Sequence, residues 1–210
     1  MNYYNKIKLI NQYSILKTLY YNLKYIPIKK VIKFPLIIGK GVKINIKGTM
    51  IIEDYSKKFI VDKNTNLNIQ GILKIKGRCK IGKNSGIYVG KKGILSIGDE
   101  FRVTSSLSLN CLKEIDIGEN VLISWQCTIL DSDFHKIYDS KKNIINNDKK
   151  IMIRDNIWIG NNVIVLKGSE INHNCIIGAG SIVSGYLENE NAIYVGNPIR
   201  KVKQNISWEH

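Results

Sequence analysis

An aliphatic side chain recurs at every sixth position in the second half of this chain. The positions are Ile153, Ile159, Val165, Ile171, Ile177 and Val183. A period of six fits neither an α-helix, with its period near 3.6, nor a simple two-faced strand. It is typical of a triangular coil, in which each side is a short strand and each new strand starts in the same phase. The sequence therefore predicts an all-β fold, a parallel β-helix of hexapeptide repeats.

A second set of small or aliphatic residues, four positions further on, is expected to point into the same narrow prism: Ile157, Val163, Ser169, Cys175 and Ser181. The period recurs upstream in three registers, formed by Ile69, Ile75, Ile81 and Ile87, by Ile97, Val103, Leu109 and Ile115, and by Ile117, Ile123 and Ile129. The slips between registers mark short insertions at corners, which a stacked solenoid tolerates. Three hexapeptides per turn predict about seven coils between residues 40 and 188, stacked at about 4.8 Å.

Asn, Asp and Gly residues that tolerate positive φ are expected at the corners. They are Gly82, Gly98–Asp99, Gly118, Asp155–Asn156, Gly160–Asn161–Asn162 and Gly178. We predict three parts in one domain: a basic helical cap segment over 1–40, the β-helix over 41–190, and a C-terminal tail over 191–210.

No apolar run approaches the roughly 20 residues of a membrane span, and the start of the chain lacks a secretory signal. The chain is therefore predicted to be cytoplasmic. Four cysteines show no CxxC pairing and no neighbouring histidine: Cys79, Cys111, Cys127 and Cys175. Inert buried thiols are favoured over disulfides or a metal site, because the compartment is reducing.

The net charge of +15 is concentrated at the N-terminal end. Residues 1–50 contain ten lysines and no acidic residue. An apolar helical stripe runs through this segment at Leu9, Tyr13, Leu16, Tyr20 and Leu23, with Lys6, Lys17 and Lys24 off the stripe, and Pro27 ends the pattern. Two compatible interpretations follow: a helix that caps the open end of the solenoid, or a basic amphipathic helix on an anionic membrane surface. Nucleic-acid binding is not expected, because the segment matches no recognition module.

The repeat is interrupted once, between Leu130 and Ile151. A loop of about twenty residues thrown out of a regular solenoid is usually functional or disordered. The loop over 131–150 carries His135, close to Asp131 and Asp133. A histidine there can serve as a general base near neutral pH, although a lone loop histidine is more often simply solvated.

Four ordered blocks resemble the hexapeptide-repeat O-acetyltransferases, among them the sugar, capsule and lipopolysaccharide enzymes and the maltose and galactoside acetyltransferases. The blocks are Val121–Ser124 with Asp131–His135, then Ile153–Gly160, Ile177–Ser181 and Val195–Val202. The resemblance implies a left-handed β-helix, a homotrimer, and acetyl-CoA in a groove between neighbouring prisms. It covers about 121–203, and the upstream coils agree in period only.

Within that family, His135 matches the catalytic histidine, which takes the proton from a sugar hydroxyl during direct acetyl transfer. Asp133 or Asp131 is the candidate that orients it. The family often has proline where Lys136 stands, and lysine where Gly185 stands. The residues that match the cofactor contacts are Trp158, Gly160, Asn161 and Ala179 for the pantetheine arm, and Arg200 with Lys201 and Lys203 for the phosphates. Coil packing is the alternative explanation for Trp158, Gly160 and Ala179.

The sequence therefore predicts an acetyl-CoA-dependent O-acetyltransferase, without a metal, acting on a sugar hydroxyl in surface polysaccharide biosynthesis. The acceptor is a sugar or glycan, lipid-linked if the basic helix holds the enzyme at the inner membrane face. The alternatives are an N-acyltransferase on a nucleotide-linked amino sugar, an antibiotic acetyltransferase and a non-catalytic scaffold. A carbonic anhydrase of this fold is excluded, because the three histidines lack the spacing for a metal site.

Overall fold

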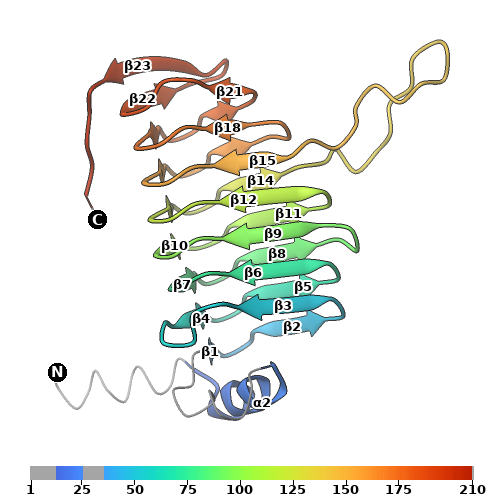
Figure 1. The fold of residues 1–210 in the computed structure, drawn as a ribbon, viewed down its shortest axis with the longest axis vertical. Helices are drawn as coiled ribbons and strands as arrows, with labels where there is room; N and C mark the ends of the chain where they lie inside the picture. The colour runs from blue at the N-terminus through green and yellow to red at the C-terminus, as the bar shows by residue number, and fades with distance from the viewer. Residues whose placement is uncertain (1–12, 26–35, 210) are drawn as a thin grey trace.

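The computed structural model describes residues 13–25 and 36–209, and these form a tall three-sided stack (Figure 1). Each side is a sheet of parallel strands, and the chain visits the three faces in turn. Seven strands on each of two faces give about seven coils, as predicted, and the architecture is the expected left-handed parallel β-helix.

The first face contains β1 (Leu36–Ile38), β4 (Phe59–Val61), β7 (Cys79–Ile81), β10 (Phe101–Val103), β13 (Leu122–Ile123), β16 (Trp158–Ile159), β19 (Ile176–Ile177), β22 (Ala192–Val195) and the antiparallel β23 (Arg200–Gln204). The second contains β2 (Lys43–Ile46), β5 (Asn66–Ile69), β8 (Gly86–Val89), β11 (Ser108–Cys111), β14 (Thr128–Leu130), β17 (Ile164–Val165) and β20 (Ile182–Val183). The third contains β3 (Thr49–Ile52), β6 (Ile72–Ile75), β9 (Ile94–Ile97), β12 (Glu114–Ile117), β15 (Ile151–Ile153), β18 (Glu170–Ile171) and β21 (Tyr186–Leu187). We call the turn from first to second face the first corner, from second to third the second corner, and from third back to first the third corner.

The interior is a column of stacked aliphatic side chains. Ile123, Ile159 and Ile177 are register partners in successive coils, and all three are fully buried. Every position of the predicted six-residue registers, and of the set four positions further on, is buried. Full burial of one such side chain stabilises the fold by about 1.5–3 kcal/mol. The interior prediction is therefore confirmed.

The corner glycines have a different role from the one predicted. Among the non-glycine residues positive φ falls mainly on asparagines, including Asn156 and Asn162, whereas the predicted corner residues Gly98 and Gly118 do not have it. A Cβ on Gly98 would lie 2.4 Å from the carbonyl oxygen of Gly118 in the next coil. Glycine is needed there because successive coils approach closely.

The helix α2 (Ile15–Tyr25) lies at the open end of the stack (Figure 1). Leu16, Tyr20 and Leu23 of the predicted apolar stripe are exposed, whereas Tyr13 is half-buried and donates its hydroxyl to Asp62 Oδ1 at 3.3 Å. The inward face combines polar side chains with Tyr21, which packs against the core. Asn22 is fully buried, and its amide donates to the carbonyl of Leu36 at 2.6 Å and accepts from the N–H of Leu36 at 3.2 Å. Thr18 Oγ1 accepts from the N–H of Ile38 at 3.1 Å. These polar side chains supply the hydrogen-bond partners that the backbone edge of β1 requires. Leu9, Lys6 and Pro27, used in the sequence argument, lie outside the described residues.

All four cysteines are buried and free. Burial raises the pKa of the Cys79 thiol, and it raises that of Cys111 to about 12. Since the thiolate is the reactive form, none of these thiols is suited to act as a nucleophile. No helix among residues 13–25 and 36–209 has the length and apolar character to cross a bilayer.

Candidate active site

The loop over 131–150 leaves the stack between β14 and β15, at the second corner, and projects as a long arm away from the body (Figure 1). Its base is fixed by the fully buried Asp131. The carboxylate accepts three backbone N–H groups of the preceding coil, from Leu112 at 2.8 Å, Lys113 at 2.8 Å and Glu114 at 2.7 Å. The N–H of Lys149 donates to the carbonyl of Asp131 at 3.1 Å and joins the two legs of the arm. Asp131 is therefore an anchor for the arm.

His135 is exposed on the first leg of the arm, near its base. Its backbone is held: the N–H donates to the carbonyl of Asp133 at 2.7 Å, and its own carbonyl accepts from the Asn146 amide at 2.7 Å. No hydrogen bond joins the imidazole to another of the described residues. A pocket of about 150 Å³ lies beside the ring, lined among others by Phe134 and Ile144. The imidazole is thus free to meet a substrate.

Asp133 contacts the support of the arm and not the histidine ring. Its Oδ2 accepts from Lys167 Nζ at 2.5 Å and from the Asn146 amide at 2.8 Å. The Lys167 and Asn146 hydrogen bonds lower the pKa of the Asp133 carboxyl, which keeps it ionised. Neither Asp131 nor Asp133 therefore orients the imidazole in this structure. Asn146 and Lys167 were missed in the sequence, where no periodicity distinguishes them from other surface residues.

The predicted cofactor residues lie mainly at or near the first corner. Ala179 is exposed and Asn161 is half-buried, each two positions after the end of a strand of the first face. Gly160 is buried, and a Cβ there would lie 2.7 Å from the backbone nitrogen of Ala179. Packing between coils alone therefore explains Gly160. Arg200 and Lys203 are exposed on β23, which covers the upper end of the first face.

Trp158 has two partners on the outer surface of the first face. Its indole N–H donates to Ser124 Oγ at 3.3 Å, and its ring centroid lies 6.2 Å from that of Trp208. Trp208 in turn donates its indole N–H to the carbonyl of Asn156 at 2.9 Å, which fixes the C-terminal tail against the third corner. With 39 % of its surface exposed, Trp158 retains a free face.

His135 and the first-corner residues stand on different edges of the prism. The arm leaves the second corner, between β14 and β15, whereas Asn161 and Ala179 follow β16 and β19 at the first corner. The second face of the prism separates these two edges within one chain.

Comparison with known proteins identifies relatives along most of the chain, although no family model matches it. A Klebsiella pneumoniae protein, described as an uncharacterized 24.8 kDa protein in the cps region, is 30% identical over 174 residues, covering 81% of this chain and 76% of the relative. The galactoside O-acetyltransferase of Escherichia coli K12 is 29% identical, over 59% of this chain and 63% of its own length. The polysialic acid O-acetyltransferase of Escherichia coli O1:K1 is 32% identical, over 64% of this chain and 42% of its own length. The chain belongs to the hexapeptide-repeat O-acetyltransferases.

Membership of this family confirms the predicted enzyme class, an acyltransferase that uses acetyl-CoA as donor. The chain spans less than two thirds of the galactoside and polysialic acid enzymes. Among solved structures, the polySia-specific acetyltransferase NeuO has a TM-score of 0.51 at 24% identity, covering 81% of this chain and 86% of that one. This likeness supports the fold.

Proposed function

We propose that this acyltransferase moves an acetyl group from acetyl-CoA to a hydroxyl group of a sugar in a surface polysaccharide, with His135 as general base. The observation that carries the proposal is the arm: the single interruption of the repeat presents an imidazole with a fixed backbone and a free ring. The relatives named for galactoside and polysialic acid support a glycan acceptor. The relative in a cps region and a putative lipopolysaccharide O-acetyl transferase of Escherichia coli K12, 26% identical over 61% of this chain, support polysaccharide biosynthesis.

In the proposed reaction, neutral His135 removes the proton from the acceptor hydroxyl as its oxygen attacks the thioester carbonyl. The new C–O bond forms, the C–S bond breaks, and the CoA thiolate takes the proton from the imidazolium. General-base assistance contributes about 10²–10⁴-fold to such a step. Positioning of the donor and stabilisation of the developing oxyanion supply the remainder.

A homotrimer, with sites between its copies, accounts for the separation of the two edges. In one chain His135 extends from the second corner, while Asn161 and Ala179 lie at the first corner. When a neighbouring copy packs against the side of the prism, the arm of one chain can reach the first corner of the other chain. Half-buried apolar side chains on the outer surface of the upper coils support this contact. They are Leu122, Ile176 and Ile193 on the first face and Leu130, Ile164 and Ile182 on the second.

Calorimetric titration with acetyl-CoA tests the donor site without knowledge of the acceptor. We expect one molecule bound per chain, with Arg200→Ala weakening the affinity about tenfold or more, because a cation beside phosphate groups forms charge-assisted hydrogen bonds. The matched control is Arg78→Ala, an exposed arginine paired with Glu100 far down the stack. Absence of binding up to millimolar acetyl-CoA would refute the proposed reaction. Equal affinities of the Arg200 and Arg78 variants would remove Arg200 from the site.

We also propose that α2 rests on an anionic membrane at its cytoplasmic face, where lipid-linked glycans are held. Its outward face exposes large apolar side chains, namely Ile15, Leu16, Leu19, Tyr20 and Leu23. Leu16 is 81% exposed and Leu23 is 59% exposed. The ten lysines and no acidic residue of positions 1–50 supply the complementary charge. An amphipathic helix flanked by many lysines binds anionic lipid in two ways: its apolar side chains are buried in the bilayer interface, and its positive charge is attracted to the headgroups.

Flotation with vesicles tests this contact in the full-length protein. We expect it to float with vesicles containing an anionic phospholipid and not with neutral phosphatidylcholine, and the double substitution Leu16→Gln with Leu23→Gln to abolish flotation. Val202→Gln removes an apolar residue of β23 that is 53% exposed, close to the value for Leu23, and should have no effect. Flotation that persists in the double variant would refute the assignment to α2.

A further inference from the structure

We propose that Lys167, Asn146 and Asp133 form a clamp that positions His135, so that the three act as positioning residues for acetyl transfer. The clamp lies where the arm joins the solenoid. Asp133 comes from the first leg of the arm, Asn146 from the returning leg, and Lys167 from the next coil. The inference rests on the proposed role of His135 and identifies the residues on which that role depends.

Asn146 is the centre of the clamp. Its amide group donates to the carbonyl of His135 at 2.7 Å and to the Asp133 carboxylate at 2.8 Å, and its Oδ1 accepts from the N–H of Ile137 at 2.7 Å. These three bonds hold the chain on both sides of His135 to the returning leg. The backbone around the histidine is thereby fixed, although the arm has few contacts with the body.

Lys167 connects this arrangement to the solenoid. It follows β17 in the coil above the arm, and its Nζ donates to Asp133 Oδ2 at 2.5 Å and to the carbonyl of Asn146 at 2.8 Å. The side chain is only 17% exposed, compared with 39% for Asp133. One ammonium group therefore holds both legs of the arm against the rigid stack. A lysine that merely balanced surface charge would not need these two directed bonds.

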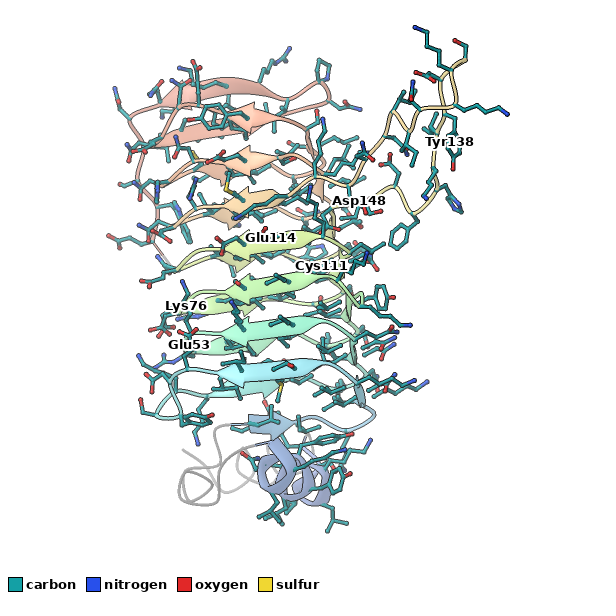
Figure 2. All side chains as sticks on the ribbon, turned by 45° about the vertical axis from the view of Figure 1, so that its right-hand side comes forward. Glu53, Lys76, Cys111, Glu114, Tyr138 and Asp148 are labelled. Carbon is teal, nitrogen blue, oxygen red and sulfur yellow. The ribbon has the colours of Figure 1, made fainter. Side chains whose placement is uncertain are left out.

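The clamp acts on the backbone and leaves the ring free. None of its hydrogen bonds reaches the imidazole, so it does not compete with the acceptor hydroxyl for the catalytic nitrogen. Figure 2 shows the setting: Asp148 marks the returning leg near the body, whereas Tyr138 lies farther out along the arm. An arm without the clamp would still be anchored at Asp131, and its outer part would sample many positions. Misplacement of a reacting group by about 1 Å costs roughly 10²-fold in rate.

The test compares Lys167→Met with Lys150→Met. Lys150 also lies at the arm base and pairs with Glu114 at 2.7 Å, but it has no bond to Asp133 or Asn146. Release of CoA thiol from acetyl-CoA is measured with polysialic acid and with a galactoside as acceptors. If neither is accepted, the slow transfer to water is compared instead. Acetyl-CoA affinity is measured separately by calorimetry.

We expect Lys167→Met to lower kcat about 10- to 100-fold with unchanged acetyl-CoA affinity. Lys167→Arg should recover most of the rate. The kcat of Lys150→Met should stay within twofold of that of the unaltered protein. Asp133→Asn, which keeps the shape and removes the charge, should resemble Lys167→Met. Amide exchange of residues 133–146 should accelerate in Lys167→Met and Asp133→Asn, and not in Lys150→Met. A kcat within twofold, a loss equal to that of Lys150→Met, or a parallel loss of acetyl-CoA affinity would overturn the proposal. An unaltered protein with no transfer to any acceptor or water would instead refute the proposed function.

Discussion

Replacing His135 with alanine is expected to lower kcat by roughly 10²–10⁴-fold while the protein still folds and still binds acetyl-CoA. The ring is exposed and makes no hydrogen bond with the other described residues, so its removal leaves no buried group unpaired. The predicted donor contacts come from the first corner and β23, so affinity for acetyl-CoA should remain. Initial rates with saturating donor, together with calorimetric titration of the same variant, measure both quantities.

The matched control is His173→Ala. This histidine lies at the third corner, where its Nδ1 accepts from the N–H of Asp155 at 3.3 Å. It is remote from the arm, and its loss should leave kcat within a few-fold. Equal rates for the His135 variant and the unaltered protein would remove the general base from the mechanism. A His173 variant as slow as the His135 variant would point to a general loss of structure.

Asp131→Ala is expected to reduce the free energy of unfolding by about 3–5 kcal/mol, the largest stability effect that we predict for a single polar side chain. Three backbone N–H groups would lose their hydrogen-bond acceptor at a fully buried site. The arm would also lose its anchor, so the activity that depends on His135 should fall in the folded fraction as well. Denaturant unfolding followed by circular dichroism measures the first effect, and initial rates measure the second.

Asp139→Ala provides the comparison, since Asp139 shapes only the outer turn of the same arm through bonds to Lys141 and Asn143. It should leave both the unfolding midpoint and kcat nearly unchanged. If Asp131→Ala unfolds at the same denaturant concentration as Asp139→Ala, the three hydrogen bonds do not stabilise the native state.

The interior of the fold could be predicted from the sequence because its cause is local. A period of six keeps Ile153, Ile159 and Val165 on the inside whatever the rest of the chain does, and the structure buries all three. The interruption of the repeat at 131–150 could also be predicted, because the loss of the six-residue period is itself a local feature of the sequence. The family resemblance then supplied the handedness and the enzyme class, which spacing alone does not contain.

The features that sequence reasoning missed depend on contacts between distant residues. The stripe of Leu16, Tyr20 and Leu23 was correctly read as helical, but which face turned inward was decided by the unpaired backbone of β1. Asn146 and Lys167 lie 11 and 32 positions after His135, and only the folded arm brings them together. Asp133 was predicted to orient the imidazole, but its carboxylate binds Lys167 and Asn146, and only its backbone carbonyl contacts His135 by accepting the N–H.

The two ends of the first face have a consequence for how many copies can assemble. A stack of parallel strands exposes unpaired N–H and C=O groups at both ends, and such edges recruit further strands into fibres. At one end, β23 crosses antiparallel to β22. At the other, the Asn22 amide occupies the donor and acceptor of Leu36 that another strand would use. At the β1 end of this face a second molecule therefore finds the hydrogen-bonding groups of Leu36 already occupied, which disfavours end-to-end growth by strand pairing at that end.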